Sequence, residues 1–234
     1  MEISIHSLLD GAARAAGTVA VIDVFRAFTT AAVALANGAE RIVMVATVEE
    51  AVALRDRGIG QVCMGEVGGR APAAFDFGNS PFEIQGVDFR GKAIVQRTSA
   101  GTQGIAAAAQ RADRLFATSL VTASATAHAI RRENPTRISL VAMGDNGRSR
   151  TDEDEICALH LRNRLEGRPG DAEAVRRLIR AGGEIMRFAD PSRPHLHPED
   201  VDIALDVDRF DFAVRVCVED GLLVGRIEKP TDTE

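Results

Sequence analysis

The stretch TVAVIDVFRAFTTAAVALANG, residues 18–38, contains an apolar run, a polar turn and an alanine-rich run in immediate succession. Thr18 to Asp23 is rich in valine and isoleucine, which is typical of a buried strand. The run from about Thr29 to Asn37 has a helical composition, and Gly38 is a typical residue for ending a helix. A buried strand that leads directly into a helix predicts the start of a βαβ unit.

The same alternation continues through the first two thirds of the chain. Further strands are predicted at 41–45, 61–64, 93–96, 115–117 and 138–143, with helices between most of them. Strands that alternate with helices predict an α/β protein with a mainly parallel sheet. Near the C-terminus, residues 212–219 and 222–226 are predicted to form a hairpin across Asp220-Gly221, a favoured two-residue turn.

Beyond Gly167 the pattern changes to two helical stretches and a segment that contains proline and histidine. One interpretation is a sub-domain boundary near residue 168. The other is that the terminal elements complete the first sheet, so that residues 1–234 form a single domain. Residues 229–234 are predicted to be a frayed tail.

Composition and charge limit the kinds of partner that this chain is expected to bind. The net charge is -6, and no run of lysine and arginine is present, which argues against nucleic acid and anionic membranes. No apolar stretch is long enough to span a bilayer, and the first residues lack the pattern of a secretory signal, so a cytoplasmic location is expected. Three widely spaced cysteines suit reduced thiols better than disulfides. The sequence leaves a homo-oligomer open.

Polar loops follow several predicted strands, and ligands of α/β proteins bind at the carboxyl ends of parallel strands. In QRTSAGTQG, residues 96–104, small residues allow backbone N–H groups to approach an anion at the start of a helix. Arg97 offers a guanidinium that suits a phosphate. The hydroxyl groups of Thr98, Ser99 and Thr102 can donate further hydrogen bonds around Gly101. The alternative is an ordinary helix N-cap with exposed hydroxyl groups.

The turn after the first strand carries Asp23 and Arg26, and Thr29 and Thr30 begin the helix that follows. A carboxylate at the end of a strand is a natural ligand for a metal ion, and Arg26 could hold a phosphate oxygen. The two threonines are candidates for binding the substrate. The alternative is a structural ion pair between Asp23 and Arg26.

A glycine-rich loop, residues 65–81, is long for a compact α/β protein, and loops of this length are commonly functional. Glu66 follows a strand directly, and Asp76 lies in a polar turn; both are hard oxygen ligands that suit magnesium. Asn79 and Ser80 are candidates for binding the substrate. The structural alternative is an Asx turn at Asp76 and a helix cap at Asn79-Ser80.

A fourth polar segment, TDEDEIC at residues 151–157, begins a predicted helix. Acidic residues in a first helical turn stabilise the helix dipole, so most of these carboxylates are expected to be structural, with one facing a pocket. His195 and His197 could bind a metal ion, but the prolines around them indicate a surface turn.

In their order along the chain, these segments resemble the 2-phosphosulfolactate phosphatase family, the ComB-like magnesium-dependent phosphatases. The resemblance is carried by VIDVFRAFTTAAVALANGA, GEVGG, FDFGNSP, RTSAGT, DEDEICA and the tail segment HPEDVDIALDVDRFDFAVRVCVEDG, and it covers nearly the whole chain. The residues that match the family's polar motif positions are Asp23, Arg26, Glu66, Asp76, Asn79, Ser80, Thr98, Gly101 and Thr102. Three positions depart from the family pattern, namely Phe28, Val67 and Ala100.

The resemblance implies a three-layer α/β/α fold with a mainly parallel or mixed sheet. It also implies magnesium-dependent hydrolysis of a phosphate monoester of a small acid, 2-phosphosulfolactate or a related phospho-acid, in coenzyme M biosynthesis. We expect Asp23, Glu66 or Asp76 to hold Mg²⁺, and Asp23, Arg26 and Glu66 to be catalytic. The attacking group is either a water molecule or the Asp23 carboxylate. The alternative function is a non-catalytic binding protein for a phosphorylated metabolite, since anion-binding turns serve both tasks.

Overall fold

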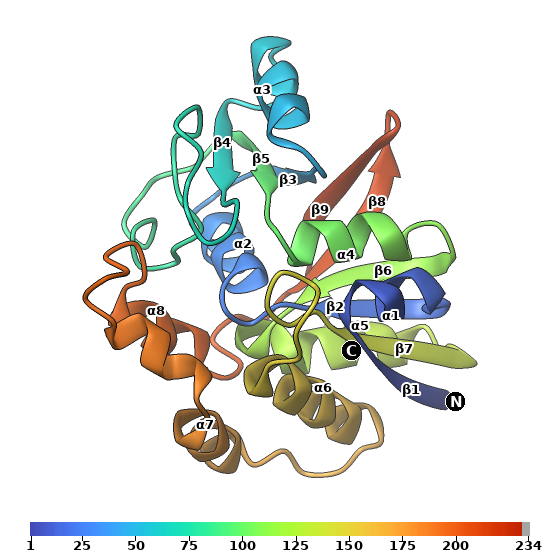
Figure 1. The fold of residues 1–234 in the computed structure, drawn as a ribbon. Helices are drawn as coiled ribbons and strands as arrows, with labels where there is room; N and C mark the ends of the chain where they lie inside the picture. Colours follow the sequence, from blue (N-terminus) through green and yellow to red (C-terminus); the bar gives the residue numbers. More distant parts are fainter. Residues whose placement is uncertain (231–234) are drawn as a thin grey trace.

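The computed structural model describes residues 1–230, which form an α/β fold around one nine-stranded sheet (Figure 1). Most of the predicted tail, residues 231–234, lies outside the described residues. The strands are β1 (Glu2–Ser7), β2 (Gly17–Ile22), β3 (Arg41–Met44), β4 (Val62–Gly65), β5 (Ala93–Arg97), β6 (Ala112–Thr118), β7 (Arg137–Ala142), β8 (Ala213–Glu219) and β9 (Leu222–Glu228).

Helices follow most of the parallel strands, as the sequence predicts. The α-helices are α1 (Leu8–Arg14), α2 (Ala27–Ala36), α3 (Val48–Asp56), α4 (Gly101–Ala108), α5 (Ala123–Arg132), α6 (Asp152–Leu165), α7 (Ala172–Ala181) and α8 (Pro198–Ala204). Two short 3₁₀ helices are η1 (Leu120–Thr122) and η2 (Glu184–Ala189), and the second replaces a predicted helical stretch. The short elements β1 and α1 are not indicated by the sequence pattern.

The strand order is β1-β7-β2-β6-β8-β9-β3-β5-β4. The first four strands are parallel to one another, and so are the last three. Three antiparallel pairings separate the two groups, so β3, β5 and β4 run opposite to β2. The sheet is therefore mixed and mostly parallel, in agreement with the predicted fold class.

The predicted C-terminal hairpin is confirmed, and it lies in the middle of the sheet. Its turn residues Asp220 and Gly221 have φ values of 50° and 80°, as a two-residue turn with positive φ at both positions requires. β8 pairs with β6 and β9 pairs with β3, so the hairpin joins the two parallel groups. The C-terminal strands β8 and β9 thus belong to the same sheet as the N-terminal strands.

Both faces of the sheet are buried, as a three-layer arrangement requires. Along β2, Val19 and Val21 belong to one apolar cluster, whereas Ala20 and Ile22 belong to another. Successive side chains of a strand point to opposite faces, so the two clusters lie on opposite sides of the sheet. Burial of each valine or isoleucine side chain contributes about 1.5–3 kcal/mol. Among the described residues, no helix is both long and apolar enough to cross a membrane.

Candidate functional site

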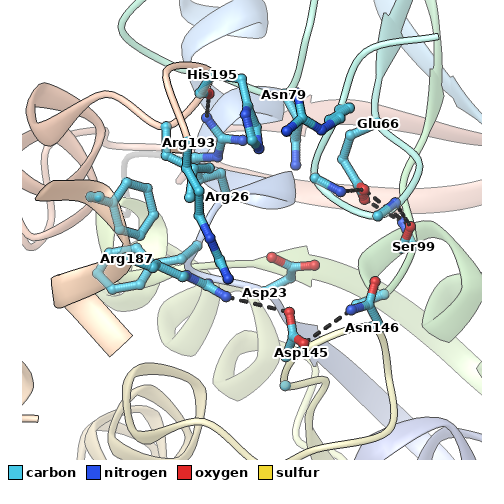
Figure 2. Close-up of a pocket in the computed structure, with 18 of the residues that line it drawn as sticks. Asp23, Arg26, Glu66, Asn79, Ser99, Asp145, Asn146, Arg187, Arg193 and His195 are labelled. Carbon is cyan, nitrogen blue, oxygen red and sulfur yellow. Dashed lines mark hydrogen bonds and ion pairs between the residues drawn. The ribbon is translucent and has the colours of Figure 1, made fainter. Parts of the chain in front are cut away.

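A polar cleft of about 410 Å³ lies where the loops after β2, β4, β5 and β7 meet the segment around η2 (Figure 2). The sequence predicts that the ends of parallel strands gather at one edge of a single sheet. The structure differs from this expectation. Within the sheet β4 and β5 run opposite to β2 and β7, and yet residues of the loops after all four strands line the same cleft. Its lining carries carboxylates and guanidinium groups together.

Asp23 lies at the end of β2 and projects into this cleft (Figure 2). Its Oδ1 accepts the N–H of Ala27, in the first turn of α2, at 3.0 Å. Burial raises the pKa of the Asp23 carboxyl group to about 6; the backbone N–H groups of Ala27 and Gly101 oppose this shift, and the charge of Glu66 adds to it. A buried acid with a perturbed pKa in a cleft is a candidate functional group.

Gly101, the first residue of α4, leaves room for Asp23. A Cβ atom at this position would lie 2.9 Å from Asp23 Oδ2, 2.9 Å from Ala27 Cβ and 3.0 Å from Phe28 Cζ. Only glycine therefore allows the starts of α2 and α4 to approach this closely around the carboxylate. Gly101 is not among the residues that line the cleft, and the clearance that it gives the Asp23 carboxylate is what the structure shows at this position.

Glu66, directly after β4, organises the turn after β5. Its Oε1 accepts the Ser99 N–H at 2.5 Å, and its Oε2 accepts the Gly69 N–H at 2.6 Å and the Ser99 hydroxyl at 3.0 Å. Three of the roughly four acceptor positions of a carboxylate are thus used. Glu66 and Ser99 both line the cleft (Figure 2), with Glu66 anchoring the small-residue turn that the sequence predicts to bind an anion.

Two acids at the start of α6 lie near Asp23. Glu153 lines the cleft, and its Oε2 atom is buried without a hydrogen-bond partner. Burial raises the pKa of Glu153 to about 7. Asp154 accepts the Val24 N–H at 2.7 Å and the Gly144 N–H at 2.8 Å, so it ties the loop after β2 to the loop after β7. Burial, with Glu153 and Asp23 nearby, raises the pKa of Asp154 well above its usual value.

Guanidinium groups line the same cleft. Arg26 donates to Asp200 at 2.7 Å and to the carbonyl oxygen of His195 at 3.2 Å, so its carboxylate partner is Asp200 rather than Asp23. Arg187 pairs with Asp145 at 3.3 Å, and its buried Nε has no partner. Arg70, Arg193 and His195 complete this set of cationic and imidazole groups. Figure 2 shows Arg26, Arg187, Arg193 and His195 around the opening that contains Asp23.

Five of the predicted site residues line the cleft, namely Asp23, Arg26, Glu66, Asn79 and Ser99. Asn79 is buried, and its side-chain oxygen has no hydrogen-bond partner, so it is available to a ligand. Eight others do not line the cleft, namely Thr29, Thr30, Asp76, Ser80, Arg97, Thr98, Gly101 and Thr102. The structure shows what most of these side chains do instead.

The predicted threonine contacts are replaced by bonds inside the fold. Thr29 donates to the carbonyl oxygen of Val24 at 2.8 Å, and Thr30 donates to that of Arg26 at 2.9 Å. Thr98 Oγ1 accepts the N–H of Thr102 at 3.0 Å, and Thr102 Oγ1 accepts the N–H of Thr98 at 2.9 Å. These four hydroxyl groups are buried and bonded within the fold, because short hydroxyl side chains readily satisfy nearby backbone groups.

Three further predicted site residues also bond to groups within the protein. Asp76 accepts the Cys63 N–H at 2.8 Å and lies 3.7 Å from Arg55, away from the cleft. Ser80 donates to Asp200 at 2.6 Å. Arg97 donates to the carbonyl oxygen of Glu66 at 2.7 Å and lines an adjoining cavity that shares Ser99, Asp145 and Asn146 with the cleft.

The sequence patterns do not indicate several residues that the cleft contains. Arg187 and Arg193 come from the segment after the changed pattern, and nothing in their neighbourhood in the sequence singles them out. His195 is in a turn as predicted, but this turn forms a wall of the cleft. The sequence predicts that one acid in the first turn of this helix faces a pocket, and the structure shows that this acid is Glu153.

The donor set fits a magnesium ion. Within residues 1–230, no three His, Cys, Asp or Glu side chains are already arranged as a metal site. Magnesium, however, commonly binds through one or two carboxylates and keeps several water molecules. Asp23 and Glu153 supply two such groups, and the unpartnered Glu153 Oε2 is an oxygen that a cation would satisfy. Glu66 retains an acceptor position beside them.

Comparisons with known proteins identify relatives of this chain. A family model described as 2-phosphosulpholactate phosphatase matches residues 4–192. A probable 2-phosphosulfolactate phosphatase of Bacillus subtilis (strain 168) is 34% identical over 202 residues, which cover 84% of this chain and 85% of that protein. One of Thermoplasma volcanium is 31% identical over 191 residues, covering 82% and 85%. One of Carboxydothermus hydrogenoformans is 44% identical over 109 residues, covering 47% and 44%.

A match of this length, on a fold whose cleft joins carboxylates to guanidinium groups, defines the class as phosphoric monoester hydrolase. Within that class the chain belongs to the 2-phosphosulfolactate phosphatase family. The resemblance that the ordered motifs indicate is thereby confirmed.

Proposed function

We propose that this protein is a magnesium-dependent phosphatase of the cytoplasm that hydrolyses the phosphate monoester of a small acid, 2-phosphosulfolactate or a related phospho-acid. The observation that carries the proposal is the juxtaposition in one cleft of the carboxylates of Asp23 and Glu153 with the guanidinium groups of Arg26 and Arg187. Carboxylates suit the metal ion, and guanidinium groups suit the phosphate and a second acidic group on the substrate. The names of the relatives support the choice of substrate.

Each group in the cleft has a defined part in the proposed reaction. Asp23 and Glu153 would hold the magnesium ion, which supplies Lewis-acid stabilisation of a phosphoryl oxygen when it is bound. Arg26 and Arg187 would bind the remaining phosphoryl oxygens, where negative charge persists through the transition state. The N–H of Ser99 is held by Glu66, so the turn keeps its shape as the substrate enters.

The attacking group is a water molecule or the carboxylate of Asp23. In either case the bond between phosphorus and the ester oxygen breaks. When water attacks, the ester oxygen takes up the proton that the water loses; when Asp23 attacks, the ester oxygen takes a proton from solvent, and water then hydrolyses the acyl phosphate to free Asp23 and inorganic phosphate. Burial of Asp23, which raises its pKa to about 6, favours proton exchange near neutral pH in the absence of a metal ion. The two routes differ in whether the oxygen of solvent enters the product directly or through a covalent phospho-enzyme.

The test is release of inorganic phosphate by the purified protein. The substrates are 2-phosphosulfolactate, phospholactate, which lacks the sulfonate group, and an aryl phosphate that lacks both acidic groups. Each is assayed with Mg²⁺ and with EDTA. We expect release that requires Mg²⁺ and that is fastest with the doubly acidic substrate. A non-catalytic binding protein would bind these compounds in calorimetry and release no phosphate from any of them, which would refute the proposed hydrolysis.

A further inference from the structure

Asp200, near the start of α8, lies outside the cleft and outside the matched range of the family model, which ends at residue 192. Its side chain is fully buried. Its Oδ2 accepts Arg26 Nη1 at 2.7 Å and the His197 N–H at 3.4 Å. Its Oδ1 accepts the Ser80 hydroxyl at 2.6 Å and the Phe82 N–H at 3.1 Å.

This arrangement joins three segments that are far apart in the sequence. Arg26 belongs to the turn after β2, Ser80 and Phe82 belong to the long loop after β4, and Asp200 belongs to the C-terminal part of the chain. Four donors converge on two carboxylate oxygens, so the carboxylate has little freedom to move. It therefore gives the Arg26 side chain a fixed anchor.

The ion pair with Asp200 leaves two nitrogen atoms of the Arg26 guanidinium able to donate to an anion. Nη1 is used by Asp200 and by the carbonyl oxygen of His195, whereas within residues 1–230 Nε and Nη2 have no hydrogen-bond partner in the protein. The guanidinium carbon also lies 5.9 Å from the centre of the Phe188 ring. An arginine side chain is long and flexible, so it loses conformational entropy when it binds an anion. The buried ion pair at Nη1 already restricts the Arg26 side chain, so less entropy is lost on binding.

We propose that Asp200 is a positioning residue that holds Arg26 in the orientation in which it binds the phosphoryl group. The inference rests on the proposed function in one respect, namely that Arg26 binds the phosphate. Asp200 does not line the cleft, so in this role it acts through Arg26 and not by contact with the phosphoryl group. A purely structural role would predict that its replacement changes stability and leaves the affinity for phosphate unchanged.

Asp200→Asn is the informative substitution. The amide oxygen can still accept from Ser80 and Phe82, but an amide N–H₂ then faces Arg26, where donor meets donor. Arg26→Ala and the variant that carries both substitutions complete a double-mutant cycle. Asp200→Ala removes the carboxylate without adding a donor and is used in the same cycle if the asparagine variant does not fold. Asp202→Asn is the matched control, because Asp202 lies on the same helix as Asp200 and its ion pair with Arg180 of α7, at 2.7 Å, is exposed.

The readout is the Kd for inorganic phosphate with Mg²⁺ present, measured by calorimetry on protein whose folding is checked by circular dichroism. We expect Asp200→Asn to weaken binding about 10- to 100-fold, as is common for residues that orient a binding group. The double variant should bind no more weakly than Arg26→Ala alone, and Asp202→Asn should bind normally. In turnover assays, the same substitution should lower kcat/KM.

Three results would overturn the inference: a folded Asp200 variant with unchanged phosphate affinity, losses that multiply in the double variant, or no phosphate binding by the unmodified protein. The calorimetric measurement requires no turnover. If the unmodified protein binds phosphate and hydrolyses no phospho-acid, the proposed function fails while the role of Asp200 is still decided by the cycle.

Discussion

Replacement of Gly101 by alanine tests the geometry around Asp23 most strictly. The added methyl group would lie 2.9 Å from Asp23 Oδ2, 2.9 Å from Ala27 Cβ and 3.0 Å from Phe28 Cζ. Contacts between a Cβ and other heavy atoms in proteins are essentially never this short, so the starts of α2 and α4 or the Asp23 carboxylate must move by several tenths of an ångström.

The size of the effect follows from two opposing contributions. Overpacking of a buried site typically costs about 1–3 kcal/mol, whereas alanine in place of glycine in a helix contributes at most about 1 kcal/mol. We therefore expect the free energy of unfolding to fall by about 1–2 kcal/mol. For a chain of this size, that corresponds to a decrease in Tm of about 2–8 °C. Displacement of Asp23 should lower turnover by about 10-fold or more, because small errors in the position of a catalytic group are costly.

The assays are urea unfolding and phosphate release at saturating substrate and Mg²⁺. Gly183→Ala is the control, since a Cβ at Gly183 meets no atom within 4 Å and its φ is -80°. That variant should stay within about 0.5 kcal/mol of the unmodified protein. A Gly101→Ala protein with unchanged stability and full turnover would refute the reasoning about clearance at this position.

Two further predictions concern buried groups. Asp154→Ala leaves the N–H groups of Val24 and Gly144 without their acceptor, so the free energy of unfolding should fall by about 2–5 kcal/mol in urea unfolding; a change below about 1 kcal/mol would contradict the tie between these loops. Burial lowers the pKa of His160, so the unfolded state binds more protons and stability should fall as the pH drops below about 6.5. His160→Leu should reduce this acid dependence of urea unfolding between pH 7 and pH 5, and an unchanged slope would contradict it.

The sequence predicts a strand, helix or turn well where the local composition alone specifies it. The apolar strand before Asp23, the alanine-rich α2 and the Asp220-Gly221 turn are each specified by local composition. Strand β1 is not anticipated, because its alternation of two isoleucines with Ser4 and His6 is short and it only borders the sheet. The opposite direction of the two parallel groups depends on where the hairpin inserts, which is a long-range pairing that no local pattern encodes.

The candidate site is predicted in part for a similar reason. Asp23, Glu66 and Ser99 each follow a strand, and that position brings them to the cleft. Thr98 and Thr102 follow a strand as well, but their hydroxyl groups satisfy each other's backbone, and composition alone cannot separate these outcomes. Arg187 reaches the cleft only because the chain after α7 folds over the loops after β2 and β7, and this arrangement depends on tertiary packing.

The central claim is that the Asp23 carboxylate takes part in phosphate ester hydrolysis in a cleft that also binds Mg²⁺. The most direct measurement is the kcat of Asp23→Asn, a nearly isosteric change, for phosphate release from 2-phosphosulfolactate at saturating Mg²⁺. The account predicts a folded protein whose kcat is lower by about 100-fold or more, in the range of single catalytic groups. Full, magnesium-dependent turnover by this variant would contradict the account.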